Sequence, residues 1–229
     1  MLHDDWVMFI PANGEGSRVA ERGPKHSLML PEGISAMWKV ANMAPYYMQT
    51  EIAMRTPSTD SPNQIPVPGN STIHFMNETL GQANTIYEWL RRTRQRQYVM
   101  ISNCDNWIDE NSVKLGMRLL EDNRTTCVVP TFRPKLANDK RFSYVQQKSR
   151  VANKRLVEHE AVSDQAVAGV YFMHMDQLMA VLWPDDIYLS QAISRMQDFY
   201  SFQVEQYMGW GDMDQLNEIE QGLPQYRID

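Results

Sequence analysis

The sequence is poor in the features that mark several common protein classes. It has two cysteines among 229 residues, Cys104 and Cys127, too few for a disulfide framework and not at the spacing of a metal site. No run approaches the ~18 uninterrupted apolar residues of a membrane-spanning helix. The N-terminus, MLHDDW, carries acidic residues where a signal peptide would be basic. We therefore expect a cytoplasmic protein without a membrane segment.

The overall composition narrows the class further. A net charge of −6 argues against a general nucleic-acid binder. The hydrophobic content of 43% and charged content of 22% are ordinary for a globular protein, and 229 residues suffice for one large α/β domain. No internal repeat or heptad pattern is visible, and nothing indicates an oligomeric state. We expect a single domain over residues 1–229.

The strongest motif lies in VMFIPANGEGSRVAERGPKHSLML, residues 7–30. A short apolar run is followed by a small-residue loop with Gly14 and Gly16, and then by Arg18 and Lys25. A buried strand that ends in such a loop commonly brings backbone N–H groups to phosphate oxygens, and the basic residues would add positive charge. The residues alone indicate an anion-binding loop, although a glycine-rich turn beside basic residues can also be only a turn.

Two familiar phosphate loops fit this stretch poorly. A Walker loop needs Gly-x-x-x-x-Gly-Lys-Ser/Thr, and the sequence contains no such run. A dinucleotide fingerprint needs a third glycine where the chain has Val19, and an acidic residue about 20 positions further on.

Strands and helices are expected to alternate in the first half of the chain, which implies a mostly parallel, doubly wound sheet with flanking helices. The expected strands there are 7–10 (ending at Pro11), 51–56, 71–76, 98–102 and 125–130, and the expected helices are 33–48, 81–94 and 110–120. Residues 57–70, with four prolines, predict a surface loop. In the second half we expect strands at 142–147, 155–158, 167–173 and 201–207, and helices at 175–182, 187–200 and 213–221.

Two carboxylates follow expected strands. Asp105 comes after the strand at 98–102, where open α/β sheets place their ligands, and a Mg²⁺ ion that bridges phosphates is a natural partner for it. Asp212 precedes the expected helix at 213–221. Either residue could instead serve the fold alone, Asp105 by holding a turn and Asp212 as a helix N-cap.

Several short segments carry a resemblance to a known family when they are taken in order. They are PANGEGSR followed by Lys25, GQA at 81–83, NCDN at 103–106, VEH at 157–159, AGVYF at 168–172 and GWGD at 209–212. Together they resemble the signature of the sugar-1-phosphate nucleotidylyltransferases. The resemblance implies a Rossmann-like α/β fold of the GT-A type in one domain, with a nucleotide-binding half at 1–135 and an acceptor-binding, metal-completing half at 136–229.

The resemblance also implies an activity and site residues. The expected enzyme is a Mg²⁺-dependent transferase of nucleotide-sugar biosynthesis, which couples an NTP to a sugar-1-phosphate, or to a small phospho-alcohol such as phosphocholine, and releases pyrophosphate. Arg18 and Lys25 would be catalytic, and Asp105 and Asp212 would bind the metal. The implied nucleotide-binding residues are Ala12, Asn13, Gly14, Gly16, Gly81 and Gln82, and the implied acceptor-binding residues are Glu158, His159 and Gly169. No nucleic-acid or membrane partner is expected.

The sequence departs from the family pattern mainly on the acceptor side. His159 stands where the family usually has a lysine, and a histidine is a poorer anion contact. The identity of the acceptor and of the nucleotide base therefore stays open.

Two alternative functions also stay open. One is a GT-A glycosyltransferase, although the Asp-x-Asp pair typical of that class is replaced by Asp105-Asn106-Trp107. The other is a non-catalytic nucleotide- or sugar-binding relative.

The role implied for Lys25 gives a first prediction. Lys25→Ala should lower turnover by orders of magnitude and leave the fold intact, because the lysine would stabilise charge on the α-phosphate. Steady-state rates and thermal unfolding, measured beside the parent chain, check this. A variant that turns over at a near-normal rate would contradict the role.

Overall fold

The computed structural model describes residues 5–14, 28–56, 66–93, 96–122, 125–136, 139–147, 154–196, 199–223 and 225–226. In chain order the elements are β1 (Trp6–Ala12), α1 (Ala36–Ala41), β2 (Gln49–Arg55), β3 (Ser71–Met76), α2 (Gln82–Leu90), β4 (Tyr98–Ser102), β5 (Asn106–Ile108), α3 (Glu110–Glu121), β6 (Cys127–Phe132), β7 (Ser143–Gln147), β8 (Lys154–Glu158), β9 (Ala166–Val167), β10 (Val170–His174), α4 (Met175–Val181), α5 (Leu189–Ile193), β11 (Tyr200–Gln203), β12 (Tyr207–Gly209) and α6 (Met213–Glu220). Within these ranges no helix combines the length and the apolar character that crossing a bilayer requires.

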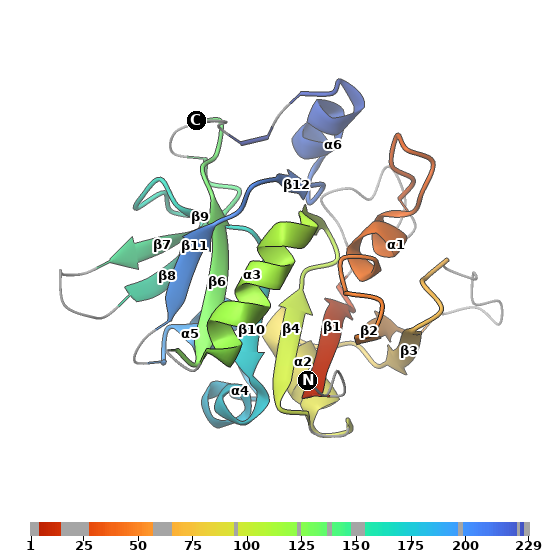
Figure 1. Ribbon diagram of the computed structural model, residues 1–229, viewed down its shortest axis with the longest axis vertical. Helices are drawn as coiled ribbons and strands as arrows, with labels where there is room; N and C mark the ends of the chain where they lie inside the picture. Colours follow the sequence, from red (N-terminus) through yellow and green to blue (C-terminus); the bar gives the residue numbers. More distant parts are fainter. Residues whose placement is uncertain are drawn as a thin grey trace.

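One large mixed sheet runs through the molecule (Figure 1). Its ten strands include the path β3-β2-β1-β4-β10-β6-β9-β7-β8, with β11 beside β6. The strands from β3 to β4 are parallel, whereas β10 pairs antiparallel with both of its neighbours and the ladders among β6, β9, β7 and β8 are antiparallel. The predicted single-domain α/β fold is confirmed, with its parallel strands concentrated in the first half.

Strand β1 explains why helices cover both faces of the sheet. All seven of its residues are buried, and alternate side chains along a strand point to opposite faces. Met8 and Ile10 join a hydrophobic cluster that includes residues of α1, α3 and α6, while Val7 and Phe9 join a second cluster with residues of α2, α4 and α5. In Figure 1, α3 crosses the front of the sheet and α2 lies behind it.

Two N-terminal boundaries differ from the sequence-based expectation. Strand β1 continues through Pro11 to Ala12, because β4 pairs with β1 only as far as Phe9, and Pro11 faces only β2 there. A proline, which lacks an N–H, is tolerated where one side of the strand has no partner. The helix expected at 33–48 is the shorter α1, which begins after Ser35, whose Oγ accepts the N–H of Trp38 at 3.1 Å.

The boundaries in the second half differ more. The helix expected to run to Tyr200 ends at Ile193, because the chain enters β11 at Tyr200 and pairs with β6 there. The strand expected at 167–173 is divided into β9 and β10 by Gly169, whose φ of +71° is not a strand conformation. The strand expected at 201–207 is divided into β11 and β12, and β5 was not anticipated. Of the expected loop at 57–70, residues 57–65 lie outside the described residues, and 66–70 form no helix or strand.

The contact between α3 and β10 generates a stability prediction. A Cβ on Gly116 would lie 2.3 Å from Cε2 of Phe172, a ring with 0% exposure. The overpacking should outweigh the ~1 kcal/mol that alanine gains over glycine in a helix. Gly116→Ala is therefore expected to lower the free energy of unfolding by about 1 kcal/mol or more.

Urea unfolding of Gly116→Ala and of a control measures this difference. The control is Gly69→Ala, because a Cβ on Gly69 would meet nothing within 4 Å. The control should stay within ~0.5 kcal/mol of the parent chain. If Gly116→Ala were as stable as the control, the packing described for α3 against β10 would be wrong.

Candidate active site

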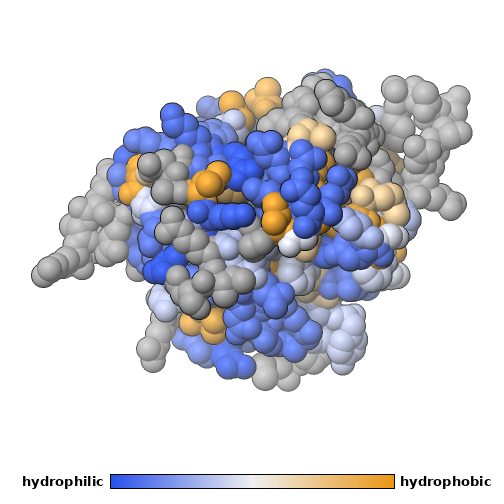
Figure 2. Space-filling model, turned by 90° about the horizontal axis from the view of Figure 1, so that it is seen from above, coloured by the Kyte–Doolittle hydropathy of each residue, from blue (hydrophilic) through white to orange (hydrophobic). Residues whose placement is uncertain are grey.

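A cavity of about 610 Å³ lies where the parallel strands β1 and β4 end. Ligands in open α/β sheets bind at this position, outside the carboxyl ends of the strands. Its lining comes from both halves of the chain and contains seven of the predicted site residues, namely Ala12, Gly14, Gly81, Gln82, Asp105, Glu158 and His159. Viewed from above in Figure 2, the described residues at the α6 end of the molecule are mostly hydrophilic. Such a surface suits a polar or charged ligand.

The first wall of the cavity is the loop after β1. Asn13 is 4% exposed, and its Nδ2 donates to the Asn77 carbonyl at 2.8 Å and to Thr79 Oγ1 at 3.0 Å. The Asn13 side chain therefore ties this loop to the segment before α2, while its neighbours Ala12 and Gly14 line the cavity. The predicted residues Gly16, Arg18 and Lys25 lie outside the described residues, and their roles stay predictions.

The start of α2 forms the adjoining wall. A Cβ on Gly81 would lie 2.7 Å from the Ile187 carbonyl oxygen, and that oxygen accepts the N–H of Ala83 at 3.1 Å. Glycine thus lets α2 begin in close contact with the segment before α5. Gln82 lines the cavity, and its Nε2 donates to Oδ1 of Asn103, which also lines it. The amide predicted to read the base is held by this bond.

The segments that carry the two predicted metal ligands, Asp105 and Asp212, are joined by the short ladder between β5 and β12. This ladder pairs Asn106 with Gly209, and the Trp210 N–H donates to the Asp105 carbonyl at 2.9 Å. A Cβ on Gly211 would lie only 3.0 Å from Oδ2 of Asp105. Asp105 therefore packs against the residue that immediately precedes Asp212.

Asp212 has a structural function as well. Its Oδ1 accepts the N–H of Gln215 at 2.9 Å as the N-cap of α6, and lies 3.7 Å from Nη1 of Arg141. Its Oδ2 has no hydrogen-bond partner among the described residues. No group of three or more His, Cys, Asp or Glu side chains that could hold a metal occurs in the described part of the chain. Two carboxylates nevertheless fit Mg²⁺, which usually takes one or two from the protein and completes its shell with water and phosphate oxygens.

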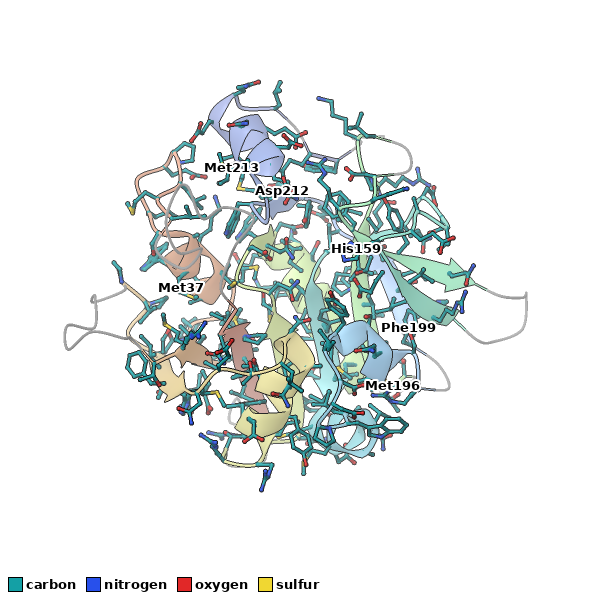
Figure 3. All side chains as sticks on the ribbon, turned by 180° about the vertical axis from the view of Figure 1, so that it is seen from behind. Met37, His159, Met196, Phe199, Asp212 and Met213 are labelled. Carbon is teal, nitrogen blue, oxygen red and sulfur yellow. The ribbon has the colours of Figure 1, made fainter. Side chains whose placement is uncertain are left out.

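The opposite wall is built by the paired strands β7 and β8. Ser143 faces Glu158 in this ladder, and its Oγ donates to Oε2 of Glu158 at 2.6 Å. His159 follows β8 with a left-handed φ of 56°, and its Nδ1 lies 3.1 Å from the Lys140 carbonyl oxygen. Figure 3 shows His159 and Asp212 at the same end of the sheet, although they come from different elements. Two of the three predicted acceptor residues, Glu158 and His159, therefore lie together in this cavity wall.

Gly169 borders a second, smaller cavity of about 90 Å³. This cavity adjoins the larger one, because Asn103, Asp105 and Arg141 line both. Burial raises the pKa of Tyr171 and of Tyr207, and the charge of nearby Asp105 adds to both shifts. These phenols stay protonated at neutral pH, and the Tyr207 hydroxyl donates to Oδ1 of Asn106 at 2.9 Å.

The motifs did not single out Arg141, which lines both cavities. Hydrogen bonds from its guanidinium to Asp139 raise the pKa of Arg141, so it remains positively charged. A basic residue directly before an expected strand, two positions after an acid, was the available sequence signal. That signal is weak, because solvent-exposed ion pairs have the same pattern.

No protein-family model matches the sequence, and no curated protein matches it. Solved structures do match. A UDP-glucose pyrophosphorylase from Acinetobacter baumannii has a TM-score of 0.72 at 15% identity, over 93% of this chain and 91% of that chain. A nucleoside-diphosphate-sugar pyrophosphorylase from Vibrio cholerae has a TM-score of 0.69 at 15% identity, over 94% and 100%. The inositol-1-phosphate CTP transferase from T. maritima has a TM-score of 0.68 at 11% identity, over 96% and 97%.

The chain has the fold of the sugar-1-phosphate nucleotidylyltransferases. The resemblance drawn from the motifs is thus confirmed at the level of the fold, over nearly the whole length of each neighbour. At identities of 11–15%, the chemistry of this nucleotidylyltransferase fold has to be argued from the side chains in the cavity.

The conformation of Gly169 generates a prediction that separates two effects. Its φ is +71°, and a Cβ there would lie 2.0 Å from Nδ2 of Asn106. Gly33 has a similar φ of +77°, but a Cβ on it would meet nothing within 4 Å. Gly33→Ala should therefore lower the free energy of unfolding only by the cost of placing an alanine in the left-handed conformation, ~1 kcal/mol.

Gly169→Ala should show that cost and, in addition, a clash of about 1–3 kcal/mol. Urea unfolding of the two variants measures the difference. Equal stability of Gly33→Ala and Gly169→Ala would refute the close packing of Asn106 against Gly169.

Proposed function

We propose that this protein transfers a nucleotidyl group from an NTP to a phosphorylated small-molecule acceptor, such as a sugar-1-phosphate, and releases pyrophosphate. The observation that supports this best is the shared cavity. The loop after β1 and the start of α2 line it on one side, β7 and β8 line it on the other, and Asp105 lies at the end of β4. Neighbours of the same fold have been solved with UTP and with UDP-glucose.

The nucleotide is assigned to the side of the cavity formed by the loop after β1 and the start of α2, which we call the first wall. Backbone groups of Ala12 and Gly14 would contact its phosphates, because the glycine permits close approach. Gly81 and Gln82 would contact the base, with the Gln82 amide oriented by Asn103. The predicted catalytic pair Arg18 and Lys25 would stabilise charge on the phosphates.

The acceptor is assigned to the opposite side of the cavity, formed by β7 and β8, which we call the second wall. The Ser143 hydroxyl donates a hydrogen bond of 2.6 Å to Oε2 of Glu158 and so fixes the orientation of the carboxylate. The second oxygen of Glu158 can then accept a hydroxyl of the acceptor, which suits a polyol or a sugar. Gly169, with His159 nearby, would complete the acceptor contacts.

The metal is assigned to Asp105 and to Oδ2 of Asp212, which has no hydrogen-bond partner among the described residues. Magnesium, when bound, would offset the negative charge of the phosphates during transfer. Asp105 and Asp212 would hold it. Gln215 keeps the other oxygen of Asp212 engaged through the N-cap bond of 2.9 Å.

The proposed reaction needs no general base. An acceptor phosphate oxygen attacks the α-phosphorus of the NTP, and a P–O bond forms as the bond from the α-phosphorus to the bridging oxygen breaks. Pyrophosphate leaves with the electron pair of the broken bond. A phosphate monoester is already anionic at neutral pH, so alignment and charge stabilisation supply most of the catalysis.

Pyrophosphate release tests the proposal. The common NTPs are combined with a panel of sugar-1-phosphates and with phosphocholine, in Mg²⁺ and in EDTA. We expect a signal for one NTP–acceptor pair, and its loss in EDTA. Release of a nucleoside diphosphate from a nucleotide-sugar would favour a glycosyltransferase instead. Nucleotide binding without turnover across the whole matrix would favour a non-catalytic binding relative.

A further inference from the structure

Arg141 occupies an unusual place in the larger cavity. It is the only Lys or Arg among the described residues that line this cavity, and it also lines the smaller cavity beside Asp105. It lies just before β7, on the same wall as Ser143 and Glu158. The second wall therefore presents one fixed positive charge beside the groups assigned to acceptor hydroxyls.

One side of the Arg141 guanidinium is held rigidly by Asp139. The Nε of Arg141 lies 2.9 Å from both carboxylate oxygens of Asp139, and Nη2 lies 2.6 Å from Oδ2. Asp139 is 9% exposed, and its carbonyl accepts the Tyr144 hydroxyl at 2.7 Å. A fork held by a carboxylate is pre-organised to meet a second anion with its remaining N–H groups.

The other side of the guanidinium keeps donors without short partners. Among the described residues, the nearest carboxylate oxygen to Nη1 is Oδ1 of Asp212 at 3.7 Å, and Nη2, beyond its bond to Asp139, lies 4.0 Å from Oε1 of Glu218. Both distances are too long for a hydrogen bond. Within the described ranges, Arg141 therefore has N–H groups available to a ligand in the cavity.

We propose that Arg141 binds the phosphate group of the acceptor, with Nη1 and Nη2 donating to two phosphate oxygens. This inference rests on the proposed function, because it assigns the acceptor to this wall. Arg141 and Glu158 line the same cavity, so one small molecule can present its phosphate to the first and its hydroxyls to the second. Arg141 supplies a permanent positive charge to this wall, because a guanidinium stays protonated in proteins.

Inorganic phosphate is the probe, because the acceptor itself is unidentified. Calorimetry measures its affinity for the full chain and for Arg141→Ala, Arg141→Lys and Arg155→Ala. Arg155 is the matched control: it is an exposed arginine of β8 that bonds Gln146 and does not line the cavity. Arg141→Ala should bind phosphate roughly 10- to 100-fold more weakly, Arg141→Lys should fall between, and Arg155→Ala should match the parent chain.

Loss of Arg141 leaves the buried Asp139 carboxylate unpaired and could unfold the chain. The double variant Asp139→Asn with Arg141→Ala removes that charge. If the single variant does not fold, phosphate affinity is measured on the double variant instead. Unchanged phosphate affinity in a folded variant overturns the proposal. So does a parent chain that binds no phosphate at millimolar concentration.

The pyrophosphate assay keeps this inference distinct from the proposed function. A silent assay with phosphate binding that depends on Arg141 would refute the transfer reaction and leave the anion site standing. Turnover in Arg141→Ala with the acceptor KM of the parent chain would refute the role of Arg141 and leave the reaction standing.

Discussion

The insertion of β10 between β4 and β6 is the constraint on which the rest of this structure depends. The parallel strands of the first half stop at β4, which would be an open edge if no strand from later in the chain paired with it. Strand β10 pairs antiparallel with β4, with Val170 opposite Ser102, and with β6, with Phe172 opposite Val128. Its amino end therefore lies beside the carboxyl end of β4, and the N–H of Asn103 donates to the Gly169 carbonyl at 2.9 Å. One sheet thus serves both walls of the cavity.

The charged groups around the cavity are mostly carboxylates, with Arg141 as the one Lys or Arg among the described lining residues. Asp105 and Asp212 lie in segments joined by the ladder between β5 and β12, where the fully buried Trp210 fixes the connection. Neighbouring carboxylates repel one another unless a cation lies near them. Arg141 is the cation that the described residues provide, with Asp139, Asp212 and Glu218 around it. The same arrangement suits a site that takes in phosphate groups together with a divalent metal ion.

Local sequence patterns predicted most of the strands, and several of the predicted site residues line the cavity. The strands at Ser71–Met76 and Tyr98–Ser102 have the expected bounds because each is a continuous segment of suitable side chains. Gly81 and Gln82 line the cavity as expected, because the start of α2 directly follows the end of a strand and its loop. The helix expected to reach Tyr200 was wrong, because the pairing of Tyr200 with Val128 of β6 overrides a weak helical pattern.

The sequence by itself determined the alternation of strands and helices and the family resemblance, because each of these depends on residues that are close together in the chain. Only the tertiary structure decided which distant residues meet. It brought Asp105 against Gly211, and it joined Ser143 to Glu158. It also placed Arg141, which the sequence did not distinguish from other basic residues, in the second wall of the cavity. These contacts depend on strand order and register, which arise from the packing of the whole chain and leave no local pattern in the sequence.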